Sequence, residues 1–262
     1  MCRVATTLRR PRWRRARDFD PSWLRTHIED ERRTAGLLGE IREAVFGAQD
    51  GLISTLAVVL TVAAATHSAF PVLIAGLASA LAGVFSMSAG EYMSSKSQRE
   101  IFEAQIASEE QEVEERPAEA EVAFMLEEEG LDRERALRVA SDIASSKPVL
   151  LKTMVEKELG LTAGDSGSPL RGAAIMGVAF GAASLIPIVP FVIVATPAAE
   201  FGSIAFTGFG LFGMGVIKSR WTRRHWLPSG LEIVGLGALA GIAGYVFGTV
   251  LPAVLGVAGI LG

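Results

Sequence analysis

The sequence predicts an all-α membrane protein with five transmembrane helices and a cytosolic helical insert between the second and third. Two observations favour this fold class. Half of the 262 residues are hydrophobic and the mean hydropathy is positive, which is unusual for a soluble domain. The apolar residues also gather in uncharged stretches at 69–90, 172–199, 201–217 and 233–262. A helix needs about 20 mostly apolar residues to cross a bilayer.

Polar, charged or proline-containing segments mark the ends of the five predicted spans. They cover 44–66, which ends before "THSAFP"; 70–92; 171–193, closed by "TPAAE"; 198–217, followed by "KSRWTRRHW"; and 231–253. The first span is not expected to be a signal peptide, because a long polar segment precedes it.

Domain organisation follows from where the charges lie. We expect an Arg-rich cytosolic tail at 1–40, spans one and two at 41–93, an acidic helical insert at 94–168, and the last three spans at 169–262. Residues 1–17 hold seven Arg and no acid, whereas 94–168 hold 18 Asp or Glu against 9 Lys or Arg. The Arg-rich start is interpreted as a disordered tail held near anionic lipid. Nothing in its pattern indicates a nucleic-acid partner, and Cys2, the single cysteine, excludes an intramolecular disulfide.

Lys and Arg in the short loops predict the orientation. The loop at 218–225 carries Lys218, Arg220, Arg223 and Arg224 without an acid, and the loops at 67–69 and 195–200 carry no Lys or Arg. Basic loops stay on the cytosolic side. The N-terminus, the insert and residues 218–230 are therefore expected in the cytosol, and the C-terminus on the far side.

Four helices are expected in the insert. The first continues from span two until Pro117 stops it; the second covers 118–131 with Gly130 as its C-cap. The third starts at the N-cap Asp132, and the fourth follows Pro148 and ends at Gly160. "TAGDSGSP" is the linker into span three.

Acidic residues of the insert repeat at helical spacing. On its first helix, Glu100, Glu103, Glu110 and Glu114 lie along one side. Such a row is either a solvated face or a site for divalent cations, for which carboxylates are hard ligands. Met154 and Glu158 share a face of the last helix; a Met at such spacing is usually core, but as a ligand it would favour softer metals.

Polar groups at membrane depth point to a passage. Glu43 and Asp50 are seven residues apart on span one, and Met87 and Glu91 are four apart on span two, so each pair shares a helix face. An acid at this depth costs about 2.5–3.5 kcal/mol on insertion scales and usually marks an ion or proton path. Glu43 and Glu91 have an alternative as helix-terminal acids reaching the interface, whereas Asp50 is deeper.

Small residues and prolines give three packing expectations. Gly47 and Gly51 should keep the neighbouring helix close to Asp50. Pro187 and Pro190 should break or kink span three. Gly237 and Gly241, spaced as GxxxG, serve either packing within the chain or a dimer seam.

Three blocks of the sequence resemble the vacuolar iron transporter family (exporters of Fe²⁺ and Mn²⁺ from the cytosol, nodulin-21-like) in the order that this family shows them. They are "REAVFGAQDGLIST", "SMSAGEYMSSKSQREIFE" and "TMVEKELGL". The resemblance runs from about residue 40 to the C-terminus. It implies a homodimeric, proton-coupled exporter of cytosolic Fe²⁺, with the path lined by spans one and two.

The resemblance also implies roles for individual residues. Asp50 and Met87 look like the transmembrane metal ligands, with Glu43 at the cytosolic mouth and Glu91 supporting the path. The insert resembles the family's metal-binding domain, where the matching residues are Glu100, Glu103, Glu114, Met154 and Glu158. Two positions depart from the pattern. Gln111 stands where a carboxylate aligns, so that Glu110 or Glu112 would substitute, and Val155 replaces a second Met.

The leading hypothesis is therefore an Fe²⁺/H⁺ antiporter that removes iron, or Mn²⁺, from the cytosol. It needs no tightly bound cofactor, because the metal is cargo and protons are the coupling ion. The partners expected are membrane lipid, divalent metal ions and a second copy of the chain. The membrane would be the plasma membrane in a bacterium and the vacuolar membrane in a eukaryote. The alternative is a non-transporting membrane anchor or metal sensor whose insert binds a partner. An enzyme is not expected, because no nucleophile–base constellation is visible.

Overall fold

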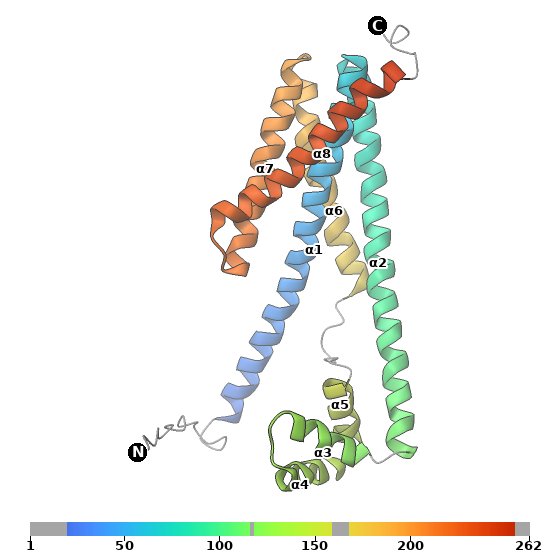
Figure 1. Cartoon of the computed structure of the whole chain (residues 1–262), viewed down its shortest axis with the longest axis vertical. Coiled ribbons are helices and arrows are strands. Elements are labelled where there is room, and N and C mark those ends of the chain that lie inside the picture. Colours follow the sequence, from blue (N-terminus) through green and yellow to red (C-terminus); the bar gives the residue numbers. More distant parts are fainter. Residues whose placement is uncertain (1–19, 116–117, 159–167, 255–262) are drawn as a thin grey trace, which may run out of the picture. The chain divides into compact units, whose positions relative to one another are not determined.

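The computed structural model describes residues 20–115, 118–158 and 168–254, with the side chains of 112–115 and 158 left out of the description. All regular structure in these residues is helical (Figure 1). The chain divides into two compact units, residues 1–38 and 39–262. The helices are α1 (Pro21–Thr66), α2 (Ala69–Glu115), α3 (Ala118–Glu128), α4 (Arg133–Ala144), α5 (Lys147–Glu158), α6 (Pro169–Ile193), α7 (Ala198–Thr222) and α8 (Trp226–Val254).

Helix α1 begins well before the first predicted span. Asp20 precedes Pro21, and its carboxylate accepts hydrogen bonds from the Ser22 backbone N–H (3.2 Å) and the Ser22 hydroxyl. A carboxylate before a first-turn proline is a favourable helix start. These bonds, that of the Ser22 side chain first, hold the pKa of Asp20 below its ordinary value of 3.8. Residues 21–40, assigned to the polar tail from sequence, are therefore helical. The Arg-rich residues 1–17 lie outside the described residues.

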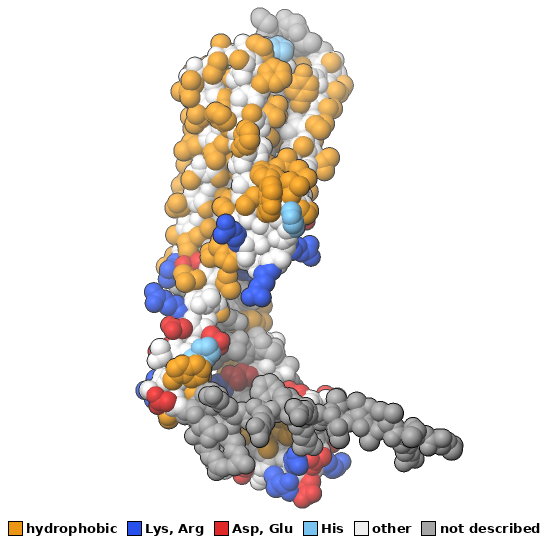
Figure 2. All heavy atoms as spheres, turned by 90° about the vertical axis from the view of Figure 1, so that its left-hand side faces the viewer, with side chains coloured by type: hydrophobic (Ala, Val, Ile, Leu, Met, Phe, Trp, Pro, Cys, Tyr) orange, Lys and Arg blue, Asp and Glu red, His pale blue; other side chains and the backbone are white. Residues whose placement is uncertain are grey.

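Five helices are long and apolar enough to cross a membrane: α1, α2, α6, α7 and α8. The chain is thus a multi-pass membrane protein, as the sequence predicts. Hydrophobic side chains cover these helices in a broad band, and Lys and Arg side chains gather where the band ends (Figure 2). The exposed apolar residues suit a hydrocarbon solvent, since lipid removes the cost of leaving them uncovered.

The membrane helices pack in sequence, α2 on α6, α6 on α7, and α7 on α8. Helix α6 runs uninterrupted through Pro187 and Pro190 to Ile193, so the helix is not broken there, and the alternative of a kink stays a prediction. A proline leaves the carbonyl four residues earlier without its N–H partner, and neighbouring groups can satisfy such freed carbonyls in a membrane. The Ser203 hydroxyl of α7 donates at 2.8 Å to the Pro187 carbonyl, which neither proline frees, and so ties α7 to α6.

The glycines of α8 pack against the same chain. A Cβ added to Gly237 would strike the Leu211 side chain of α7, and one on Gly244 would lie 2.5 Å from the Ala57 carbonyl oxygen of α1. The hydroxyl of Thr61 on α1 also donates to the Gly244 carbonyl at 2.9 Å. Packing within the chain is therefore the role that the structure gives to this glycine stripe.

Helices α3, α4 and α5 form a small bundle, and α5 also contacts α2. The predicted caps are confirmed. Asp132 accepts a hydrogen bond from the Arg135 backbone N–H at 3.1 Å, and Gly130 adopts a φ of 103° after α3, a region open to glycine. The bundle core is built from eight buried residues: Ala118, Val122, Ala123, Leu126, Ala136, Ala140, Leu150 and Met154.

Candidate functional site

Helix α1 approaches α6 closely on both sides of Asp50. A Cβ on Gly47 would lie 2.5 Å from the Met176 carbonyl oxygen, and one on Gly51 would collide with the Phe180 carbonyl oxygen. The two glycines therefore hold a neighbour close, as predicted. That neighbour is α6, however, and not α2, the helix that carries Met87.

Asp50 is partly buried in the membrane-spanning part of α1. Its backbone carbonyl accepts the Ser54 hydroxyl at 2.6 Å, but its carboxylate forms no hydrogen bond or ion pair with any described residue. A carboxylate in this position needs a proton, a cation or a further polar partner. Met87 is likewise partly buried on α2, so its side chain is not fully enclosed by other parts of the protein.

Glu43 of α1 and Glu91 of α2 lie near the same end of the apolar segments. Their carboxylates, on α1 and α2, are close enough to repel each other electrostatically. One oxygen of Glu43 is buried without a hydrogen-bond partner among the described residues, and the carboxylate lies against Gly172 of α6, where an added Cβ would be 3.0 Å from Oε2. Ser95 donates its hydroxyl to Glu91 Oε1 at 2.6 Å and so orients that side chain. Carboxylates are oxygen ligands for divalent cations, so both acids are candidates for such a role.

An ion pair between α6 and α1 lies one turn before Glu43. Arg171 at the start of α6 binds Glu40 of α1, with Nη2 2.9 Å from Oε1. Sequence reasoning missed the pair, because only the fold brings residues 131 positions apart into contact. Arg171 is therefore already paired with Glu40. Glu43 forms no ion pair with any described residue.

The acidic row on α2 is exposed. Lys96 Nζ lies 3.7 Å from Glu100 Oε1 and Arg99 Nε lies 2.9 Å from Glu103 Oε1, each one turn earlier on the same helix. Glu110 is exposed too. A role of this face in gathering metal stays a prediction, as does the substitution at Gln111, which is exposed. Three side chains of the prediction lie outside the described residues: Glu112, Glu114 and Glu158.

Met154 is a core residue of the α3–α5 bundle, with 1 % of its surface exposed. The neighbouring Val155 is buried as well. The structure therefore does not bring Met154 onto the face that carries Glu100 and Glu103. Its assignment as a metal ligand stays a prediction, and its packing role is what the described contacts support.

Glu109 is a buried acid that the sequence reasoning did not single out. It follows Phe102 and Ile106, both partly buried, at spacings of four and three, so it shares their face of α2. An acid in line with an apolar stripe is the signal that would have found it.

Among the described residues, no group of three or more His, Cys, Asp and Glu side chains converges to hold a metal ion. The described arrangement offers two acids near the end of the apolar segments, Glu43 and Glu91, and further into those segments one acid and one thioether, Asp50 and Met87. Within the described residues these groups do not form the closed ligand shell that a resident metal requires.

Known proteins are similar in sequence to this chain over most of its length. The chain is 28 % identical over 232 residues to "Vacuolar iron transporter 2" of Oryza sativa subsp. japonica, covering 83 % of this chain and 94 % of the relative. It is 29 % identical over 222 residues to "Vacuolar iron transporter 1" of Arabidopsis thaliana, covering 84 % and 88 %. A relative in Plasmodium falciparum, "Vacuolar iron transporter", is 28 % identical over 226 residues, covering 80 % and 82 %.

A family model described as the VIT family matches residues 41–249. The match begins just before Glu43 and continues through all five apolar helices into α8. It covers every membrane residue singled out above and the whole insert. The chain therefore belongs to the VIT family.

Proposed function

We propose that this protein transports Fe²⁺ out of the cytosol in exchange for protons. One observation carries the proposal: one oxygen of Glu43 is buried without a hydrogen-bond partner among the described residues, and the charge of Glu91 on α2 acts repulsively on the same carboxylate. Two like-charged carboxylates near the end of apolar helices are costly to keep ionised unless a cation binds them or a proton neutralises one of them. The names of the relatives specify iron.

Asp50 and Met87 are proposed as the ligands deeper in the membrane. Fe²⁺ accepts a mixture of oxygen and sulfur ligands, which a carboxylate and a thioether supply. A carboxylate must lose its proton to bind a metal. Protons arriving from an acidic far side would therefore displace Fe²⁺ from Asp50, and this competition couples the two fluxes. Mn²⁺ suits the same ligands and is proposed as a second cargo.

A second copy of the chain is proposed to complete the path. In a monomer the partly exposed carboxylate of Asp50 would face hydrocarbon, at a cost of about 2.5–3.5 kcal/mol on insertion scales. A homodimer with α1 and α2 at its interface would cover this surface and double the ligands. The proposed orientation places the mouth at Glu43, the insert and the α7–α8 turn in the cytosol, because that turn carries four basic residues and no acid.

The test is uptake of ⁵⁵Fe²⁺ into proteoliposomes with an acidic lumen, made with the full-length chain. Asp50→Asn keeps the shape of the side chain and removes its charge, and we expect it to abolish uptake that the wild type shows. Glu119→Gln, an exposed carboxylate on α3, is the matched control and should transport normally. Equal uptake by Asp50→Asn and wild type would overturn the mechanism. Absence of uptake of both Fe²⁺ and Mn²⁺ by the wild type would favour the anchor or sensor alternative.

A further inference from the structure

The turn between α7 and α8 concentrates positive charge at the end of the apolar band. Lys218, Arg220, Arg223 and Arg224 fall within seven residues. Lys218 is engaged by Glu232 of α8, with Nζ 3.4 Å from Oε2. The three arginines form no ion pair with any described residue. Their guanidinium groups are therefore available to an external anion.

Two tryptophans at this turn favour a position at the membrane surface. Trp221 and Trp226, which flank Arg223 and Arg224 in the sequence, are 47 % and 50 % exposed, and indole rings prefer the headgroup level of a bilayer. Trp226 is also fixed by Phe212, ring to ring at 6.0 Å in an edge-to-face arrangement. Arg223 and Arg224, between the two indoles, and Arg220, next to Trp221, are accordingly expected at the depth of lipid phosphates.

The turn itself is tight and fixed. Arg223 ends α7 in a left-handed conformation, with φ 52° and ψ 25°. Gly215 and Gly230 let the two helices touch beside it, where an added Cβ on Gly215 would lie 2.5 Å from the Gly230 Cα. The basic groups are thus presented by a short connection between two packed helices.

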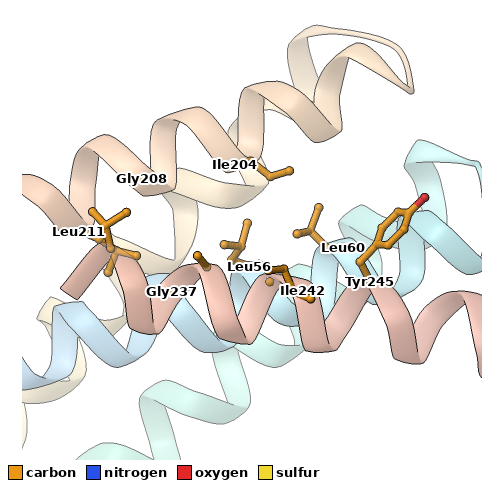
Figure 3. A pocket seen from close by; sticks show the side chains of 11 residues that line it. Leu56, Leu60, Ile204, Gly208, Leu211, Gly237, Ile242 and Tyr245 are labelled. Carbon is orange, nitrogen blue, oxygen red and sulfur yellow. The ribbon is translucent and has the colours of Figure 1, made fainter. Parts of the chain in front are cut away.

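Two cavities adjoin these helices. One of about 420 Å³ borders the turn and is lined by Arg224, His225, Pro228, Ser229 and Glu232. The other, about 310 Å³, lies in the membrane part between α1, α7 and α8. In Figure 3, Leu56 and Leu60 of α1 and Tyr245 of α8 surround this gap. Its lining is almost wholly apolar, and Gly208, Gly237 and Gly241 leave it open because they carry no side chain.

We propose that α7 and α8 bind an anionic phospholipid, with the phosphate on Arg220, Arg223 and Arg224 and one acyl chain in the apolar cavity. Guanidinium groups pair with phosphate oxygens through charge-assisted hydrogen bonds. The cytosolic leaflet supplies anionic lipid, and a dry apolar cavity in a membrane is filled by hydrocarbon at no desolvation cost. This proposal is independent of the transported ion.

The test is native mass spectrometry of the full-length protein in detergent, titrated with phosphatidylglycerol and, separately, phosphatidylcholine. We expect selective binding of phosphatidylglycerol by the wild type. The triple variant Arg220→Gln, Arg223→Gln, Arg224→Gln should bind it on the order of a hundredfold more weakly, since each of the three basic residues near a bilayer surface strengthens anionic-lipid binding about fivefold. Inorganic phosphate at equal concentration should not displace the lipid.

Two further variants make the test specific. Arg133→Gln, Arg135→Gln, Arg138→Gln removes the same charge from α4 of the insert and should bind phosphatidylglycerol like the wild type. Gly208→Leu fills the apolar cavity, and the space around Gly208 is open, so the fold should persist while lipid binding falls. Unchanged binding by the α7–α8 triple variant would overturn the proposal, and so would an equal loss in the α4 variant. Unchanged binding by Gly208→Leu would overturn the assignment of the acyl chain to the apolar cavity.

Discussion

Glu43 and Glu40 lie one helical turn apart on α1 and have different surroundings. The Glu43 carboxylate lies against Gly172, experiences repulsion from the charge of Glu91, and has one oxygen without a hydrogen bond in the described structure. Glu40 instead pairs with Arg171. The unfavourable surroundings of Glu43 are the reason for proposing that this acid, and not Glu40, takes part in transport.

We predict that Glu43→Gln slows iron uptake without lowering the thermal unfolding temperature. The variant removes a repulsion with Glu91 and keeps the shape of the side chain, so stability should stay equal or rise. Glu40→Gln is the control: it loses an exposed ion pair worth about 0–1 kcal/mol and should transport normally. Initial ⁵⁵Fe²⁺ uptake rates and melting curves in detergent check both. A lower melting temperature with normal uptake in Glu43→Gln would contradict the prediction.

Two buried hydroxyls on α7 should respond to substitution in opposite ways. Ser203 donates to the Pro187 carbonyl at 2.8 Å, whereas the Thr207 hydroxyl is buried without a partner among the described residues. Ser203→Ala should cost about 0.6–1.7 kcal/mol, the range of interhelical hydrogen bonds in membranes. Thr207→Val removes an unsatisfied group at constant shape and should be neutral or stabilising. Equilibrium unfolding in mixed micelles measures both, and a larger loss in Thr207→Val would refute the comparison.

At the scale of helices, the pair α1 and α6 depends on glycine where the backbones meet. Gly51→Ala would place a methyl group onto the Phe180 carbonyl oxygen, and we expect it to destabilise the protein by about 1–3 kcal/mol, as overpacking generally does. Gly213→Ala on α7 is the matched control, because nothing lies within 4 Å of its added Cβ. That variant should be neutral or gain up to about 1 kcal/mol from helix propensity. Similar melting temperatures for the two variants would show that α6 yields to the added methyl group.

The helices themselves could be predicted from sequence because their signals are local. Uncharged runs marked the spans, and Asp132 and Gly130 marked helix ends in the insert. The start of α1 was missed because residues 21–40 carry many charged side chains among a few apolar ones, so this part of the helix gives no hydropathy signal of a membrane span. The contact of Gly51 with Phe180 was missed for another reason. Small residues show that some helix comes close, but the identity of that helix depends on the fold as a whole.

The candidate site was predictable to the same extent. Helical spacing placed Glu43 with Asp50 and Met87 with Glu91, since both pairs are local. The electrostatic interaction of Glu43 with Glu91 could be expected only from the predicted pairing of spans one and two. Met154 illustrates the limit: spacing alone does not say which side of a helix is buried, and the bundle of α3, α4 and α5 takes this side chain into its core.

For the whole molecule, the orientation in the membrane is open to a direct measurement. We predict that the insert and the loop between α1 and α2 are accessible from opposite sides. In a Cys2→Ser background, Ser141→Cys on α4 and Ser68→Cys in the loop introduce one exposed thiol each. In inside-out vesicles, a membrane-impermeant maleimide should label Ser141→Cys at once and Ser68→Cys only after detergent is added. Immediate labelling of both would contradict the predicted orientation.

Helix α2 is one uninterrupted element of 47 residues, about 70 Å long at 1.5 Å per residue. The hydrocarbon of a bilayer is about 30 Å thick, so more than half of this helix extends beyond the hydrocarbon. Met87 and Glu91 lie on the same helix as the acidic row at Glu100 and Glu103, and the helix is not interrupted between them. The helix is therefore one continuous element, so a tilt imposed where α5 contacts it would also displace Met87 and Glu91.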